Sequence, residues 1–166
     1  MSRHGADVDR TEEWAALRAR HLKAHEARPE SSARGVHHLA LLSSDVETTI
    51  RFYQDVLEFP LTELFENRDY QGSTHFFFDI GHGNRLAFFD FPGLGLEGYA
   101  EVLGGLHHIA ISVAPEQWER LRDRLAAAEV DTFELSGSSL YFSGPDGERL
   151  ELIKDPLGEM YGTTGL

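Results

Sequence analysis

The most constraining feature of the sequence is a short motif that occurs twice. Gly35-Val-His-His-Leu-Ala-Leu is repeated as Gly105-Leu-His-His-Ile-Ala-Ile, and the two copies differ only by exchanges among aliphatic residues. The later segments also match, because FDIGHGNRLAFFDFP from Phe78 aligns without gaps with FSGPDGERLELIKDP from Phe142. A period of about 65 to 70 residues is too long for a solenoid repeat, and it predicts a duplicated module.

Each half of the repeat has the same expected order of elements. A strand-like run is followed by a helical pattern, for which Asp45 is the expected N-cap in the first half and Pro115 a first-turn residue in the second. Two or three strands with a Gly-rich turn between the last two then follow. We therefore expect two modules whose sheets pack together.

The chain before the first repeat has a different character. The segment Asp9–Ala27 is rich in helix formers and predicts a helix. Three of its residues share one face, which is expected to pack on the domain or on a second subunit: Trp14, Leu17 and His21. The expected boundaries are an N-terminal helical extension and linker over 1–34, a first module over 35–100, and a second module with a C-terminal tail over 101–166.

Composition excludes several functional classes. The 166 residues carry a net charge of −13, which opposes binding to nucleic-acid phosphates or anionic membranes. The absence of cysteine excludes disulfides and thiolate metal sites, so any metal must be held by nitrogen and oxygen. The polar N-terminus lacks a signal-like core, and no apolar stretch approaches the roughly 20 residues that span a bilayer. These features predict a soluble, cytoplasmic protein.

Only one histidine of each pair can face a common cavity, because neighbouring residues of a strand point to opposite faces. His38 and His108 share their faces with smaller residues than their neighbours do. We therefore assign His38 and His108 to the cavity, and we assign His37 and His107 to the helix-packed face or its rim.

Two further positions complete the predicted site. Pseudo-twofold symmetry is expected to bring His38 opposite His108, and the aligned final strands make Glu151 the counterpart of Ala87. Glu151 is a carboxylate in an otherwise apolar strand pattern, where an unpaired charge is costly to bury. Coordination of a divalent cation by His38, His108 and Glu151 explains it. Two imidazoles and one carboxylate are typical of non-haem Fe(II), although Mn(II), Co(II), Ni(II) or Zn(II) also suit these ligands.

The segments VHHLALLSSDVETTIRFYQDVLEFPL, LHHIAISV and LYFSGPDGERLEL together resemble the vicinal oxygen chelate superfamily over residues 35 to about 157. The resemblance implies an α+β fold with two paired βαβββ modules that form a cup-shaped mixed β-sheet around one divalent ion. Glyoxalase I-like members have a fourth protein ligand where this chain has Ala87, whereas the extradiol dioxygenases use a His, His, Glu set. The resemblance therefore points to the three-ligand, dioxygenase-like members.

The same resemblance suggests candidate catalytic residues. Extradiol dioxygenases carry a tyrosine ten residues before the glutamate, where this chain has Tyr141, and a phenol there can bind a substrate oxygen or donate a proton. They also use second-shell histidines, of which one is absent here, since no histidine follows His108. His75, at the start of an aromatic strand, is the better candidate for the other, and His82 is expected in an exposed turn.

Strand parity suggests that four aromatic side chains form apolar walls of the cavity: Phe76, Phe78, Phe88 and Tyr141. Such walls favour an aromatic or otherwise hydrophobic small molecule with vicinal oxygens as the substrate.

These observations lead to one principal hypothesis and two alternatives. The principal one is an Fe(II)-dependent extradiol-type dioxygenase with dioxygen as co-substrate, a homodimer being an open possibility through the N-terminal helix. The first alternative is a non-oxidative metal-dependent lyase or isomerase of glyoxalase type. The second is a drug-binding resistance protein, against which the retention of all three ligands argues.

Overall fold

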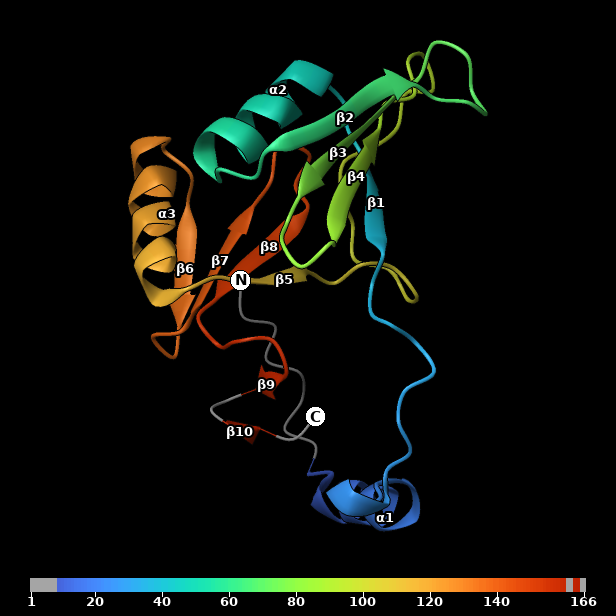
Figure 1. The fold of residues 1–166 in the computed structure, drawn as a ribbon, viewed down its shortest axis with the longest axis vertical. Helices are drawn as coiled ribbons and strands as arrows, with labels where there is room; N and C mark the ends of the chain where they lie inside the picture. The colour runs from blue at the N-terminus through green and yellow to red at the C-terminus, as the bar shows by residue number, and fades with distance from the viewer. Residues whose placement is uncertain (1–8, 161–162, 165–166) are drawn as a thin grey trace. The chain divides into compact units, whose positions relative to one another are not determined.

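The computed structural model describes residues 9–160 and 163–164, and the chain divides between Arg34 and Gly35 into two units (Figure 1). In the N-terminal unit, α1 covers Thr11–His21 and a short 3₁₀ turn, η1, covers His25–Ala27. The predicted helix is thus shorter than expected. No residue of α1 is buried within this unit, and the predicted packing of its apolar face on the domain or on a second subunit stays a prediction.

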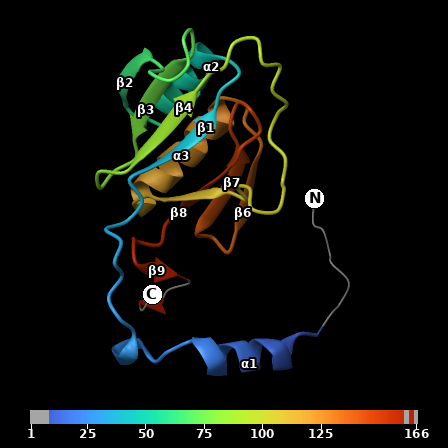
Figure 2. The same cartoon turned by 90° about the vertical axis from the view of Figure 1, so that its right-hand side faces the viewer.

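The two repeats form two four-stranded mixed sheets with the same connectivity, and together they make up Gly35–Thr164 (Figures 1 and 2). The elements of the first repeat, here module 1, are β1 (His38–Leu42), α2 (Val46–Ile50), the π-helix η2 (Arg51–Val56), β2 (Leu61–Glu66), β3 (Thr74–Asp79) and β4 (Arg85–Phe89). The elements of the second repeat, module 2, are β5 (Ile109–Ser112), α3 (Pro115–Ala127), β6 (Thr132–Leu135), β7 (Ser139–Ser143) and β8 (Arg149–Ile153). The strand orders are β1-β4-β3-β2 and β5-β8-β7-β6, with the first and last strands of each module parallel. The predicted α+β fold of paired βαβββ modules is confirmed.

Both helix starts agree with the sequence. The Asp45 carboxylate accepts a hydrogen bond from the backbone N–H of Thr48 at 2.7 Å, which satisfies a donor at the start of α2. In α3, Pro115 occupies the first turn, where its missing N–H costs nothing. The apolar stripe of each helix then faces the sheet of its own module.

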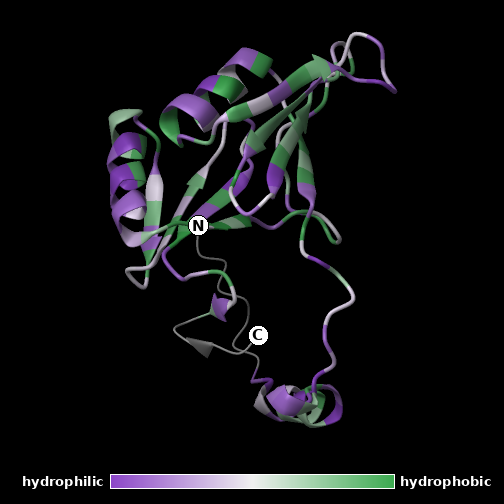
Figure 3. Cartoon of the chain, in the orientation of Figure 1, coloured by the Kyte–Doolittle hydropathy of each residue, from purple (hydrophilic) through white to green (hydrophobic). Residues whose placement is uncertain are grey.

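A single hydrophobic core joins the helix-packed faces of the two sheets. It includes Tyr53 and Leu57 from module 1 and Trp118, Leu121 and Leu125 from α3, together with the apolar residues of both sheets that point toward the helices. The visible side of α3 is largely hydrophilic (Figure 3). The helices therefore cover one face of each sheet, and the opposite faces lie outside this core.

Three phenylalanines that the sequence assigned to the cavity belong to this core instead. Phe76, Phe78 and Phe88 are at most 1% exposed and pack against one another, and Phe78 and Phe88 also contact the Tyr53 ring. The prediction that they form cavity walls is therefore wrong. Ala87 lies next to Phe88 in β4, and successive strand residues point to opposite faces. Once Ala87 is assigned to the site, Phe88 must therefore face the helices.

Polar contacts reinforce the joint between the modules. The Tyr53 hydroxyl donates to Glu148 Oε1 at 2.6 Å, and both residues are buried. The Arg124 Nε of α3 donates to the backbone carbonyl of Val56 at 2.9 Å. These bonds connect η2 with two parts of module 2, so the two modules share their helical side.

After β8, two short antiparallel strands follow, β9 (Glu159–Met160) and β10 (Thr163–Thr164). Among the described residues, no helix is both long and apolar enough to cross a membrane.

Candidate metal centre

Three of the predicted site residues come together on the sheet of module 2. The open face of module 2 is the sheet face opposite α3, and it carries His108, Ala110, Ser112, Phe133, Leu135, Ser139, Tyr141, Glu151 and Ile153. Tyr141 and Glu151 are direct neighbours across β7 and β8. The Nε2 atom of His108 lies 3.1 Å from Glu151 Oε2, and the His108 and Tyr141 rings meet edge to face at 5.7 Å.

The Glu151 carboxylate is the most informative member of this cluster. Its residue is 4% exposed, although it lies on a face that the core does not cover. A buried carboxylate is costly unless it is paired or coordinates a cation, and His108 is the one partner that the described residues supply at short distance. The pair therefore places one imidazole nitrogen and one carboxylate oxygen within 3.1 Å of each other.

The other two predicted residues lie on the sheet of module 1. The open face of module 1 is the face opposite α2 and η2, and it carries His38, Ala40, Leu42, Glu63, Phe65, His75, Phe77, Ala87 and Phe89. His38 begins β1, and its ring meets the Phe77 ring edge to face at 6.2 Å. His75 stacks on Phe89 with 3.8 Å between ring centroids.

His75 has an unusual polar environment. Its Nε2 atom is buried and has no hydrogen-bond partner in the described part of the chain. Burial lowers the pKa of the His75 imidazole, and the nearby His38 ring lowers it further. A neutral ring with a free nitrogen can donate or accept a proton, depending on its tautomer.

The register confirms the symmetry argument from the sequence. Ala40 is paired with Ala87 in module 1, and Ala110 is paired with Glu151 in module 2. Ala87 and Glu151 are therefore structural counterparts. Phe77 and Tyr141 are counterparts as well, because each lies beside that position on the next strand.

One expectation about the geometry is not met within a single chain. Among residues 9–160 and 163–164, no three His, Asp or Glu side chains lie close enough together to hold a metal ion. His38 therefore does not join His108 and Glu151. The reason lies in the core: the modules meet through their helical sides, so their open faces do not enclose a common space within one chain.

The donor chemistry nevertheless fits a divalent cation. Imidazole nitrogen and carboxylate oxygen suit first-row divalent metals, and the buried Glu151 beside His108 provides two of the three residues of a His, His, Glu set.

Sequence reasoning missed most of the aromatic wall. Phe65, Phe77 and Phe89 surround His75 on the open face of module 1, with ring centroids 5.4, 4.3 and 3.8 Å from its ring. The signal was available, since these residues have the parity of His75 and Ala87. His82 lies in an exposed turn with φ of 51°, as expected, and does not belong to this wall.

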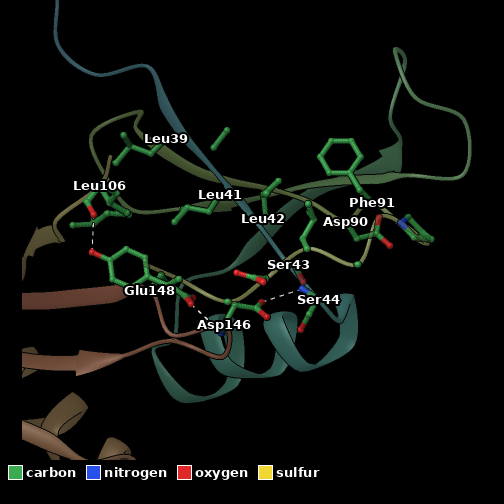
Figure 4. Close-up of a pocket in the computed structure, with 18 of the residues that line it drawn as sticks. Leu39, Leu41, Leu42, Ser43, Ser44, Asp90, Phe91, Leu106, Asp146 and Glu148 are labelled. Atoms are coloured by element: carbon green, nitrogen blue, oxygen red, sulfur yellow. Dashed lines mark hydrogen bonds between the residues drawn. The ribbon is translucent and has the colours of Figure 1, made fainter. Parts of the chain in front are cut away.

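A cavity of about 750 Å³ lies elsewhere, between β1 and the chain segment that follows β4 (Figure 4). Asp90, Asp146 and Glu148 contribute carboxylates to its lining, and none of the five predicted site residues lines it. Asp146 accepts a hydrogen bond from the Ser44 backbone at 3.0 Å. Burial raises the pKa of Glu148.

Comparison with known proteins settles the family. The family model of the Glyoxalase/Bleomycin resistance protein/Dioxygenase superfamily matches residues 35–152, which include both repeats and Glu151. The chain belongs to this superfamily. The superfamily is that of the metal-dependent vicinal oxygen chelate enzymes, as the motifs suggested.

Two similar proteins carry the names of different activities. Metallothiol transferase FosB of Shouchella clausii is 29% identical over 133 residues, which are 75% of this chain and 83% of that protein. Putative ring-cleaving dioxygenase MhqA of Bacillus subtilis is 26% identical over 136 residues. The match covers 77% of this chain but only 42% of the dioxygenase, so the chain spans less than half of that relative's length.

A solved superfamily structure shows the same fold. The fosfomycin resistance protein FosX from Listeria monocytogenes, in complex with Mn(II) and a sulfate ion, has a TM-score of 0.59 and 22% sequence identity. The superposition covers 76% of this chain and 97% of FosX. A divalent metal is thus bound by a member of the superfamily.

Proposed function

We propose that the chain is a metal-dependent enzyme whose ligands are His108 and Glu151 of one copy and His38 of a second copy. The observation that carries this proposal is the 3.1 Å approach of His108 Nε2 to the buried Glu151 carboxylate, with Tyr141 beside them. Superfamily membership supports the enzymatic role, and the homologous transferase and dioxygenase are both enzymes.

Exposed apolar surface supports the involvement of a second copy. Phe133 and Leu135 on the open face of module 2 are 63% and 51% exposed, and Leu42 and Phe65 on the open face of module 1 are exposed as well. Large contiguous apolar exposure in a soluble chain marks a surface that another molecule covers. In a twofold dimer, module 1 of each copy meets module 2 of the other, which makes two equivalent sites.

A complementation experiment tests this arrangement without knowledge of the substrate. The His38→Ala and Glu151→Ala variants are each expected to lose Mn(II) binding. When they are unfolded together and refolded, half of the dimers contain one of each, and one of their two sites is intact. Mn(II) binding should therefore return to about a quarter of the wild-type level.

The matched control combines His108→Ala with Glu151→Ala. These two residues serve the same site from the same copy, so the mixture should recover no Mn(II) binding. Recovery in the control, or no recovery in the first mixture, would contradict the composite site.

The expected reaction is oxidative, with Fe(II) as the metal and dioxygen as the second substrate. A bound Fe(II) would supply a Lewis acid that lowers the pKa of a substrate hydroxyl and a centre for dioxygen chemistry. Tyr141, next to Glu151, is placed to bind a substrate oxygen through its phenol. His75 is the candidate proton carrier, since its buried Nε2 has no partner among the described residues.

The surfaces of the two open faces favour an aromatic substrate. Phe65, Phe77 and Phe89 offer ring surfaces around His75. Arg85 and Arg149 extend the two open faces by strand parity, as the neighbours of His38 and Ser143, and Arg149 is already paired with Glu101 at 2.5 Å. An anionic substrate such as a phosphonate would need more unpaired positive charge than these two arginines supply. An aromatic vicinal diol is therefore the better fit.

Oxygen uptake tests the reaction type. The protein is purified anaerobically, loaded with Fe(II) and supplied with a panel of catechols. Oxygen consumption with ring-opened products is expected. A different result would indicate non-oxidative chemistry: the Fe(II)-loaded dimer consumes no oxygen with any catechol, and the protein is active with Mn(II) or Zn(II).

Thiol transfer is a second candidate, because the chain matches 83% of the length of a metallothiol transferase. Anaerobic incubation of the Mn(II)-loaded protein with low-molecular-weight thiols and an epoxide distinguishes the two. Thiol consumption without a need for dioxygen would favour the transferase.

A further inference from the structure

The cavity beside β1 belongs to the unit Gly35–Thr164, and none of the proposed metal ligands lines it. Its volume of about 750 Å³ is typical of pockets that bind small molecules. β1 is an edge strand, because in its sheet it pairs only with β4. Leu106 and Ile109, just before and at the start of β5, also line the cavity. The cavity therefore lies at an edge of β1, where segments of both modules meet.

Much of the cavity wall is apolar. The side chains of Leu39, Leu41 and Leu42 lie along one side of it (Figure 4). The segment that follows β4 contributes Gly93 and Gly95, whose φ angles are 86° and 59°. Glycine lets the main chain approach a ligand closely, because it has no side chain in the way. The wall therefore suits a ligand with a hydrophobic body.

The charged side chains of the wall all have the same sign. No Lys, Arg or His of the described chain lines the cavity, and the charged residues that do are Asp90, Glu97, Asp146 and Glu148. Within the described residues, none of these four carboxylates belongs to an ion pair. A concave site lined by one sign of charge attracts ligands of the opposite sign.

Hydrogen bonds from the protein hold two of these carboxylates in place. Glu148 accepts from the Tyr53 hydroxyl through Oε1 and from the Asp146 backbone N–H, at 3.0 Å, through Oε2. Asp146 accepts from the Ser44 backbone N–H through Oδ2 at 3.0 Å. Among the described residues, Asp146 Oδ1 has no hydrogen-bond partner. One oxygen of Asp146 therefore remains available to a donor in the cavity.

The environment of Glu148 shows that the negative charge is not compensated. Burial raises the pKa of its carboxyl, and repulsion from Asp146 raises this pKa further. A cation in the cavity would oppose both effects. That cation is not a bare metal ion, since no three His, Asp or Glu side chains of the described residues lie close enough together to hold one. An organic cation can fill the cavity and meet the carboxylates along its wall.

We propose that this cavity binds an organic ammonium ion with a hydrophobic body, and that Asp146 is the main partner of its ammonium group. The ammonium N–H donates to Asp146 Oδ1, which makes a charge-assisted hydrogen bond. The hydrophobic body packs against the leucines of β1. This binding site is separate from the proposed metal centre and does not depend on it.

Three probes with the same phenylbutyl body test the preference for a cation: 4-phenylbutylamine, 4-phenylbutanol and 4-phenylbutanoate. Isothermal titration calorimetry at neutral pH, with the whole chain and no added metal, measures their affinities. The amine should bind once per chain and about 10-fold more tightly than the alcohol, and the carboxylate should bind most weakly. Equal affinities of amine and alcohol, or no binding of the amine at millimolar concentration, would overturn the proposal.

Asp146→Asn tests the assigned partner, because the amide oxygen can still accept from Ser44 while the charge is lost. Affinity for the amine should fall about 10- to 100-fold, and affinity for the alcohol should stay the same. The matched control is Asp131→Asn, an exposed position outside the cavity with the same change in net charge. It should bind both probes as the wild type does. Equal losses in the two variants would mean that net charge alone attracts the amine.

Gly98→Leu tests the location. Gly98 lines the cavity, and a Cβ atom there would come no closer than 3.6 Å to another residue, the Asp146 carbonyl oxygen. The larger side chain should occupy part of the cavity and weaken both amine and alcohol by at least about 10-fold. Urea denaturation checks that the variant is folded. Unchanged binding in Gly98→Leu, or loss of amine binding in Glu151→Ala, would place the amine outside this cavity and overturn the proposal.

Discussion

The two modules have the same fold but opposite chemical characters. At structurally equivalent positions, module 1 has Ala87 and Phe77 where module 2 has Glu151 and Tyr141. The open face of module 1 is an aromatic surface around His75, whereas the corresponding face of module 2 carries a carboxylate, a phenol and an imidazole. The comparison teaches that two modules with the same fold can take different roles. Module 1 offers an apolar surface that suits the hydrophobic part of a substrate, and module 2 offers polar groups that suit chemistry.

The largest expected effect comes from the position where this asymmetry is strongest. Glu151→Ala should lower Mn(II) affinity by more than about 100-fold, since loss of a direct ligand should exceed the loss caused by an outer partner. Equilibrium dialysis of the dimer measures this. The matched control is Ser143→Ala at the exposed end of β7, which should bind Mn(II) as the wild type does. A normal affinity in Glu151→Ala would remove the basis of the proposed site.

A reciprocal exchange tests the second asymmetric pair. Tyr141→Phe should reduce kcat by about 100-fold with little change in KM, because a positioned proton donor acts mainly in the transition state. Phe77→Tyr, at the counterpart position, should leave kcat nearly unchanged. Steady-state kinetics on an identified substrate provide both values, and equal effects of the two changes would mean that the modules are not specialised.

Loss of the hydrogen bond between Tyr53 and Glu148, which connects the two modules, should have a smaller effect, and this effect concerns stability. Tyr53→Phe removes the hydroxyl that donates to Glu148 at 2.6 Å and leaves a buried carboxylate oxygen without that partner. The free energy of unfolding should fall by about 1–3 kcal/mol, as measured by urea denaturation. Tyr70→Phe, at an exposed position, should change it by less than about 0.5 kcal/mol.

The smallest expected effect concerns pH. Burial raises the pKa of Glu148 above its ordinary value of 4.5, so the folded state binds its proton more tightly than the unfolded state does. The stability from this residue is present below pH 4.5 and is lost as the pH rises through the folded pKa. Its counterpart in module 1, Asn84, has no such dependence.

Glu148→Gln tests this difference. The free energy of unfolding of the variant, relative to the wild type, should rise by about 1 kcal/mol between pH 4.5 and pH 7.5. Urea denaturation at the two pH values measures it. A constant difference would show that Glu148 is not responsible for the pH dependence.

Much of the fold and part of the site could be predicted from the sequence. The repeated motif predicted the duplication, and the N-cap at Asp45 and the turn residue Pro115 marked two helix starts that the structure confirms. The faces of the histidine strands were also predicted, because residue size along a strand reports which side is packed. The assignment of Phe76, Phe78 and Phe88 failed because their strand neighbours His75, Phe77 and Ala87 lie on the open face, so these three side chains must face the helices.

The sequence by itself determined the folding unit and the chemistry of the donors, since hydrophobic periodicity and residue type are local properties. Its two histidine motifs and the asymmetry between Glu151 and Ala87 follow from alignment of the chain with itself. Only the tertiary structure decided which residues meet. The modules bury their helical sides together, because that is where most of their apolar area lies, and this leaves His38 away from His108 and Glu151 within one chain. The parallel pairing of β5 with β8 also brings Arg149 to His107, a contact between positions that are far apart in the sequence.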